Sequence, residues 1–558
     1  MGTKHTKILL STLFLLITTS AFAQPSAVKN VQKAVFAFIT YDKAGNKLDE
    51  GNGVFISNDG EAIAQCKPFI GCYRAEITDY SGKKYEVKRI IGANEVHNVV
   101  HLKTDAKTTP ATILNAATPQ QGTKLYCVGT KQNGAIKQGA VRSVETFLDK
   151  YSYYIIKMTE QEDLGGCPFV TEQGQVVGLL EISANTADAY STDIRYGKSL
   201  IPQVLSASDP TLVKIHIPLQ LPAEQDNARI VMMMLTRADS LKHLTAAQDY
   251  IKAFPNTIEG YPIAASVEAS AGKFADAENT MNQALNNVAD KAAANYEFGK
   301  LIYNKLLYQP EPPYEKWTYD KALEYIKAAQ ATDKSSLYRN LEAQILFSQQ
   351  KYAEADEILT SLITADDVNK AEIYYESARC KQAMGKSDEE LVVLLDSAIN
   401  NVDSISITSA APYFLMRAQV YDNMKKYREA VFDYSRYQII MNNRVNDSFF
   451  YTRFKAEVNA RLYKQALVDI QNCIALVPNE PLYPAEKAQL ELRVGMLEEA
   501  VQSASYCIQI APDAYTGYTL LALAQARLDK KEEAKQNFLK AKELGETKAD
   551  EYMEKYLK

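Results

Sequence analysis

The chain has 558 residues, of which 46% are hydrophobic and 23% charged, as is usual for a globular protein of two or three folding units. Its 62 basic and 68 acidic residues give a net charge of −6. This balance argues against a nucleic-acid partner, because proteins that bind nucleic acids usually carry a basic surface.

The first 23 residues have the features of a secretory signal peptide. Lys4 and Lys7 precede an apolar run from Ile8 to Ile17, and Ala21–Ala23 supplies the small-x-small cleavage pattern. The run is too short for a permanent membrane span, and no later run reaches the length that a span requires. We therefore expect a bacterial protein that is periplasmic or secreted, is cleaved after Ala23 and has no integral membrane segment. Loss of the two lysines takes its net charge from −6 to −8.

Seven cysteines are spread along the chain, and the odd number leaves at least one of them unpaired. Export makes disulfides possible, and Cys66 and Cys72 are the closest candidates. Cys473 and Cys507 occupy equivalent positions of two repeats, where a small buried thiol is expected. The histidines beyond the signal lack neighbours of metal-ligand type, so we expect neither a metal nor a cofactor. They are His97, His101, His216 and His243.

Residues 30–205 predict an all-β domain. Short apolar runs alternate with Gly, Asn and Asp turns, as in Lys33–Thr40, Gly53–Ser57 and Gln175–Ile182. Runs of this length and spacing are typical of a sandwich or a barrel.

The order of motifs in this segment resembles the trypsin-like, HtrA-like serine peptidases. Gly51–Gly60 is similar to the glycine-rich opening of that family, and Gly122–Gly129 is similar to the strand that opens its second barrel. Leu164–Val170 matches the segment around the family's nucleophile. The resemblance implies a double β-barrel with a cleft between the barrels.

The three positions that match the family's His, Asp and Ser hold Lys67, Asn98 and Gly165. Peptide hydrolysis needs a nucleophile, a base and a group that orients the base. A lysine is protonated at neutral pH, an asparagine has no charge to stabilise an imidazolium, and a glycine has no side chain. We therefore predict a pseudo-peptidase without catalytic residues.

Two alternatives stay open. Cys167 lies two residues after the nucleophile position, so a Cys167–Lys67 dyad would make the protein a peptidase of non-standard mechanism. Pro168 argues against this, because it aligns Cys167 with a glycine of the family motif. The turn at Gly165 and Gly166 can also keep N–H groups that bind a carbonyl or carboxylate, which would preserve peptide binding without cleavage.

After an expected linker at 206–227, residues 228–558 repeat with a period of 34, as Lys464–Pro478 and Glu498–Pro512 show. This period of paired helices resembles the tetratricopeptide repeat, so we predict an all-α solenoid of that family. The family's small residue near the start of each second helix is matched by Ala277, Ala322, Ala355, Ala430, Ala466, Ala500 and Ala534, and once by Leu391.

Three further segments interrupt or end the pattern. Val213–Leu221 alternates apolar and polar residues, which favours an extra strand against the barrel. Pro310–Pro313 cannot be helical throughout and predicts an inserted loop. Lys542–Lys558 predicts a polar helix that caps the last repeat.

The resemblance also implies a concave face, formed by the first helices, that binds peptides or partner proteins. The family's groove positions are occupied here by Leu415, Gln419, Asp422, Tyr451, Lys455, Gln489, Thr519 and Leu523. The sequence therefore predicts an exported, non-catalytic adaptor or scaffold with a protein or peptide partner. A structural or assembly-factor role in an envelope complex is the third hypothesis.

Overall fold

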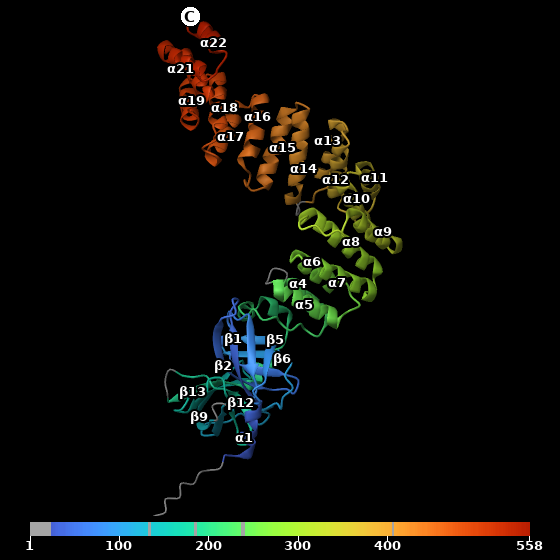
Figure 1. Cartoon of the computed structure of the whole chain (residues 1–558), viewed down its shortest axis with the longest axis vertical. Coiled ribbons are helices and arrows are strands. Elements are labelled where there is room, and N and C mark those ends of the chain that lie inside the picture. The colour runs from blue at the N-terminus through green and yellow to red at the C-terminus, as the bar shows by residue number, and fades with distance from the viewer. Residues whose placement is uncertain (1–23, 132–134, 184–186, 236–239, 404–406) are drawn as a thin grey trace, which may run out of the picture. The chain divides into compact units, whose positions relative to one another are not determined.

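The computed structural model describes residues 24–131, 135–183, 187–235, 240–403 and 407–558. The expected signal peptide lies outside the described residues. The chain divides into two compact units (Figure 1). One extends to Leu301 and includes Glu311–Tyr314, and the other consists of Ile302–Pro310 and Glu315–Lys558.

Six strands of the first unit close into a barrel in the order β1-β2-β3-β6-β5-β4. They are β1 (Val35–Tyr41), β2 (Lys47–Phe55), β3 (Glu61–Ala64), β4 (Arg74–Thr78), β5 (Lys84–Asn94) and β6 (Val99–Thr104). Phe36 and Phe38 of β1 point into the core, as strand alternation requires. A Cβ on Gly53 would lie 2.5 Å from the Phe36 ring, so a glycine is needed where β2 crosses that side chain.

A second, seven-stranded sheet follows, with the order β13-β10-β9-β8-β11-β12-β7. Its strands are β7 (Thr112–Ile113), β8 (Lys124–Val128), β9 (Ile136–Phe147), β10 (Tyr151–Lys157), β11 (Pro168–Val170), β12 (Gln175–Leu179) and β13 (Asp188–Thr192). Isolated bridges pair Gly178 with Asp193 and Glu181 with Tyr190, which brings the β13 edge of the sheet back beside β12. The prediction of a β-rich N-terminal domain with a barrel is thus confirmed.

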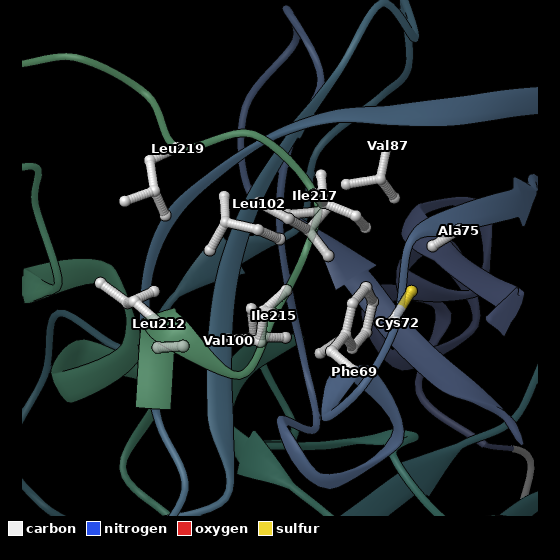
Figure 2. Packing of buried hydrophobic residues seen from close by; sticks show 14 of the residues in the cluster. Phe69, Cys72, Ala75, Val87, Val100, Leu102, Leu212, Ile215, Ile217 and Leu219 are labelled. Atoms are coloured by element: carbon white, nitrogen blue, oxygen red, sulfur yellow. The ribbon is translucent and has the colours of Figure 1, made fainter. Parts of the chain in front are cut away.

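Residues 212–221 pack against the barrel and add apolar side chains to its core (Figure 2). Ile215, Ile217 and Leu219 are buried there beside Phe69 and Cys72. Backbone hydrogen bonds fix the segment on both sides, from the His216 N–H to the Cys72 carbonyl and from the Ile90 N–H to the Pro218 carbonyl. Val213 is the last residue of the short helix α3 (Pro210–Val213), and among the described residues Leu219 alone of the predicted strand forms a β-bridge, with Ile90, so a full strand is not formed there.

The first two helices of the predicted repeat region, α4 (Gln225–Met234) and α5 (Ser240–Ala253), belong to the same core as the barrel. Val231 and Tyr250 are buried in it, and Arg89 of β5 forms a two-point ion pair with Asp249 of α5, with distances of 2.6 and 2.7 Å. This core is continuous, and the first compact unit extends to Leu301.

Paired helices form the rest of the chain, which confirms the predicted helical-repeat region. The small residues near the start of the second helices are all buried, with Leu391 2% exposed and the seven alanines 0% exposed. The helices from the third onward are α6 (Gly260–Ser270), α7 (Phe274–Asn287), α8 (Lys291–Tyr308), α9 (Tyr319–Thr332), α10 (Ser336–Ser348), α11 (Tyr352–Leu362), α12 (Lys370–Ala383), α13 (Asp388–Asn400), α14 (Ala411–Asn423), α15 (Tyr427–Ile440), α16 (Asp447–Asn459), α17 (Tyr463–Leu476), α18 (Leu482–Val494), α19 (Leu497–Ile510), α20 (Tyr515–Arg527), α21 (Lys531–Glu543) and α22 (Ala549–Tyr556).

The interruptions fall where the sequence places them. Residues 309–318, which include the prolines, form the loop between α8 and α9. The last helix, α22, packs Tyr552 against Phe538 of α21, but it begins at Ala549 because Gly545 ends α21 in a left-handed turn. The seven cysteines are free, buried thiols, so the bridge considered between Cys66 and Cys72 is not formed.

Candidate functional site

The structure brings Lys67 and Asn98 together through Glu181, which no sequence motif singled out. Lys67 Nζ and Asn98 Nδ2 both donate to Glu181 Oε1, at 2.8 and 3.2 Å. The Lys67 backbone N–H also donates to Asn98 Oδ1 at 3.0 Å. Lys67 and Asn98 belong to the first barrel and Glu181 to the second sheet, so this polar group ties the two together.

Gly165 lies on the same boundary. Its carbonyl accepts a hydrogen bond of 2.8 Å from Asn52 Nδ2, and a Cβ placed on it would lie 3.1 Å from Ile182 Cδ1. The Gly166 N–H donates to the Leu180 carbonyl at 2.8 Å. That N–H group is therefore already used within the protein and is not free to bind a carbonyl of a ligand.

We call this boundary the seam, which consists of Asn52, Gln65, Lys67 and Asn98 of the first barrel and Gly165, Leu180 and Glu181 facing them. Gln65 Nε2 adds a further bond of 3.0 Å to the Leu180 carbonyl. The space left between Gln65, Asn98 and Glu181 is about 10 Å³, roughly that of one water-sized sphere. The contact between the first barrel and the second sheet therefore leaves little enclosed space beside Glu181.

Cys167 does not reach the seam as a nucleophile. Its side chain is 0% exposed and packs with Leu125 and Tyr154 in the core of the second sheet. Burial raises the pKa of this thiol to about 12, so it stays protonated at neutral pH. Among the described residues, the side-chain partners of Glu181 are Lys67 and Asn98, and neither provides a hydroxyl or thiol.

The helical repeats contain an open groove of about 750 Å³, a size suited to a ligand. Side chains of α16, α18, α20 and α22 line it. Its walls are largely apolar and aromatic, with Phe454, Leu520, Leu523 and Tyr552 among the lining residues. Four charged side chains also line it, namely Glu486, Arg493, Arg527 and Glu546.

Three of the predicted groove residues, Gln489, Thr519 and Leu523, line this groove. Tyr451 adjoins it through a hydrogen bond of 3.3 Å to Glu486, and Lys455 Nζ lies 4.8 Å from the centre of the Tyr451 ring. Burial beside Glu486 raises the pKa of Tyr451 to about 12, so its hydroxyl remains a donor.

The other predicted groove residues lie one repeat earlier, on α14, and do not line the groove. Gln419 is exposed, whereas burial raises the pKa of Asp422 against the opposing effect of Lys455. Leu415 packs against the buried cluster of Ala418, Ala430 and Tyr434. Sequence reasoning missed Arg493 and Arg527, although their separation of 34 residues equals the repeat period.

Among the described residues, no group of three or more His, Cys, Asp or Glu side chains is arranged to hold a metal ion. Within the same ranges, the helices are too short or too polar to cross a membrane.

Comparison with known proteins gives little further information. No protein-family model matches the chain, and no curated protein matches it. A solved structure of a serine endoprotease from Yersinia pestis is similar at 16% identity over 34% of this chain, with a TM-score of 0.28. The chain spans 66% of that structure's length. This likeness is too low to assign either a fold or an activity.

Proposed function

We propose that the protein is an exported, non-catalytic adaptor that binds an extended polypeptide in the groove of its helical repeats. In this proposal the N-terminal domain is a trypsin-like double barrel that has lost its catalytic groups, and the repeats are a tetratricopeptide solenoid. The observation that carries the proposal is the contrast in space, about 750 Å³ in the groove against about 10 Å³ at the seam.

The chemistry of the groove supports a polypeptide ligand. Leucine and aromatic side chains bury apolar side chains of a ligand, and Gln489 and Thr516 offer hydrogen-bonding groups to its backbone. No strong charge of one sign fills the groove, since two arginines and two glutamates line it. Stacked helical pairs present such surfaces because each pair packs only on its neighbours and leaves one face open.

Peptidase activity from Cys167 and Lys67 is the second candidate, and the contacts of both residues disfavour it. The thiol is buried and its pKa is raised to about 12, while the Lys67 ammonium group is held by Glu181. A thiolate nucleophile needs the opposite environment, with partial exposure and a neighbouring cation.

Binding is tested by filling the groove. Gln489 is exposed and lines the groove, so Gln489→Trp should obstruct it without disturbing the core. Gln536→Trp is the matched control, because Gln536 is an exposed glutamine of α21 outside the groove. We expect fluorescence anisotropy to show that labelled casein fragments bind the unmodified protein and Gln536→Trp, and bind Gln489→Trp at least about tenfold more weakly. Equal binding by all three proteins would remove the groove from the proposal.

A further inference from the structure

Two arginines occupy equivalent positions along the groove. Arg493 lies in the last turn of α18 and Arg527 in the last turn of α20, and the 34 residues between them are one repeat. Both side chains are exposed, and both line the groove.

The guanidinium groups of these arginines have donors to spare. Each guanidinium carries five N–H donors in a planar fork that suits a carboxylate. Arg493 stacks over the Tyr463 ring at 5.2 Å, and Arg527 donates to the Leu492 carbonyl. Among the described residues, neither arginine forms an ion pair with a carboxylate.

The two glutamates of the groove lie away from the arginines. Glu486 precedes Arg493 by seven residues on α18, a separation of about 10 Å along the helix axis. Glu546 accepts a hydrogen bond of 3.4 Å from Thr519, which precedes Arg527 by eight residues on α20, or about 12 Å. The groove therefore has a basic edge at the C-terminal ends of α18 and α20, and its acidic groups lie toward their N-terminal ends.

We infer that the groove selects an extended acidic polypeptide segment that has two carboxylates three residues apart and apolar side chains between them. This inference rests on the proposed function and adds the chemistry of the ligand. The carboxylates pair with Arg493 and Arg527, and the apolar side chains contact Val458, Leu520 and Leu523.

The three-residue spacing follows from geometry. Helices that pack directly, as α18 and α20 do, lie roughly 8–10 Å apart. A segment in the polyproline II conformation rises about 3.1 Å per residue with three residues per turn. Its side chains i and i+3 therefore point to the same side about 9 Å apart, close to the spacing expected between the axes of α18 and α20.

The arginines also suit the dipoles of the helices that they end. That role alone predicts lower helix stability on substitution but no effect on peptide affinity. The two roles are therefore separable by measuring both quantities.

The test uses four labelled peptides of matched composition. GLEPLELG has the inferred spacing, GLEEPLLG has the same residues with adjacent glutamates, and GLQPLQLG and GLKPLKLG replace the acids. We expect GLEPLELG to bind the full chain about tenfold more tightly than GLQPLQLG, GLEEPLLG to be intermediate, and GLKPLKLG to be weakest. Added salt should reduce the difference, because exposed ion pairs are screened.

Protein variants identify the groups responsible. Arg493→Gln and Arg527→Gln should each weaken GLEPLELG about threefold, as expected for an exposed ion pair, and leave GLQPLQLG unchanged. Arg428→Gln is the matched control, because Arg428 is an exposed arginine of α15 outside the groove, and it should change neither affinity. Circular dichroism at each temperature of measurement checks that the variants are folded.

Equal affinity of the unmodified protein for GLEPLELG and GLQPLQLG would overturn the inference. If Gln489→Trp then weakens both peptides, the proposed function still holds and the acidic preference alone is rejected. Absence of binding by every peptide also overturns the inference, and in that case the casein fragments decide the proposed function separately.

Discussion

The seam of the β-domain and the groove of the helical repeats differ in how their polar groups are satisfied. At the seam, Lys67, Asn98 and Glu181 bond to one another and leave about 10 Å³ of space. In the groove, Arg493 and Arg527 have no carboxylate partner among the described residues, and about 750 Å³ is open. The sequence resemblance to peptidases therefore directs attention to the seam, whereas the charged groups that could bind a ligand lie in the groove.

The largest expected effect concerns the ion pair that supports the groove wall. Arg453 of α16 forms two hydrogen bonds with Asp469 of α17, at 2.7 and 2.9 Å, and lies 3.8 Å from Glu457. Arg453→Met would leave the buried Asp469 carboxylate without a cation, at a cost of about 3–5 kcal/mol in the free energy of unfolding. Urea unfolding of Arg436→Met, which changes an exposed arginine of α15, should differ from the unmodified protein by less than about 0.5 kcal/mol.

Close packing at the seam gives the next effect. Gly166 has φ +78°, and a Cβ on it would lie 2.4 Å from the Asn52 carbonyl oxygen. Gly166→Ala should therefore lower the free energy of unfolding by about 2–4 kcal/mol. Gly122 has a similar φ of +86° but nothing within 4 Å of an added Cβ, so Gly122→Ala isolates the backbone cost of about 1 kcal/mol. Equal losses in the two variants would mean that the seam is not tightly packed.

The buried Glu457 of the groove wall should make the free energy of unfolding depend on pH. Burial, with Asp469 nearby, raises the pKa of Glu457 from 4.5 to about 8. Between these values the unfolded chain loses this proton and the folded chain keeps it, so the stability contribution falls as pH rises from 4.5 to 8.

Glu457→Gln removes that dependence. Relative to the unmodified protein, it should gain roughly 1–3 kcal/mol at pH 8 and nothing near pH 4. Chemical unfolding at several pH values measures the difference, with Glu429→Gln, an exposed glutamate of α15, as the control. A gain that grows toward low pH would contradict the assignment.

The smallest effect is expected at the seam's ion pair. The Lys67 side chain is 63% exposed, and exposed pairs contribute at most about 1 kcal/mol. Lys67→Ala should therefore change the free energy of unfolding of the first unit by less than about 1 kcal/mol. A loss of several kcal/mol would show that the seam depends on this pair far more than its exposure implies.

The sequence predicted those features of the fold and the site that depend on contacts between residues close together in the chain. The 34-residue period and the buried small residues, such as Ala466 and Ala500, identified the repeats because each repeat contacts only its neighbours. The same period would have identified Arg493 and Arg527. Glu181 gave no such signal, since it meets Lys67 across 114 residues of sequence.

The extent of the first unit was also hidden from sequence. The apolar positions of α4 and α5, such as Val231 and Tyr250, predict helices with one buried face but do not say what covers it. In the structure, the buried faces of α4 and α5 pack against the barrel core, to which residues 212–221 also contribute. A long-range choice of packing partner is not encoded in local periodicity.

The most direct test of the account is to follow cleavage and binding of one substrate in one sample. Casein labelled with a self-quenching dye should bind the protein, and the account predicts that the dye stays quenched through prolonged incubation because the casein is not cleaved. Gln489→Trp should weaken binding at least about tenfold, and Cys167→Ala should change nothing. Dequenching by the unmodified protein that disappears in Cys167→Ala would contradict the account.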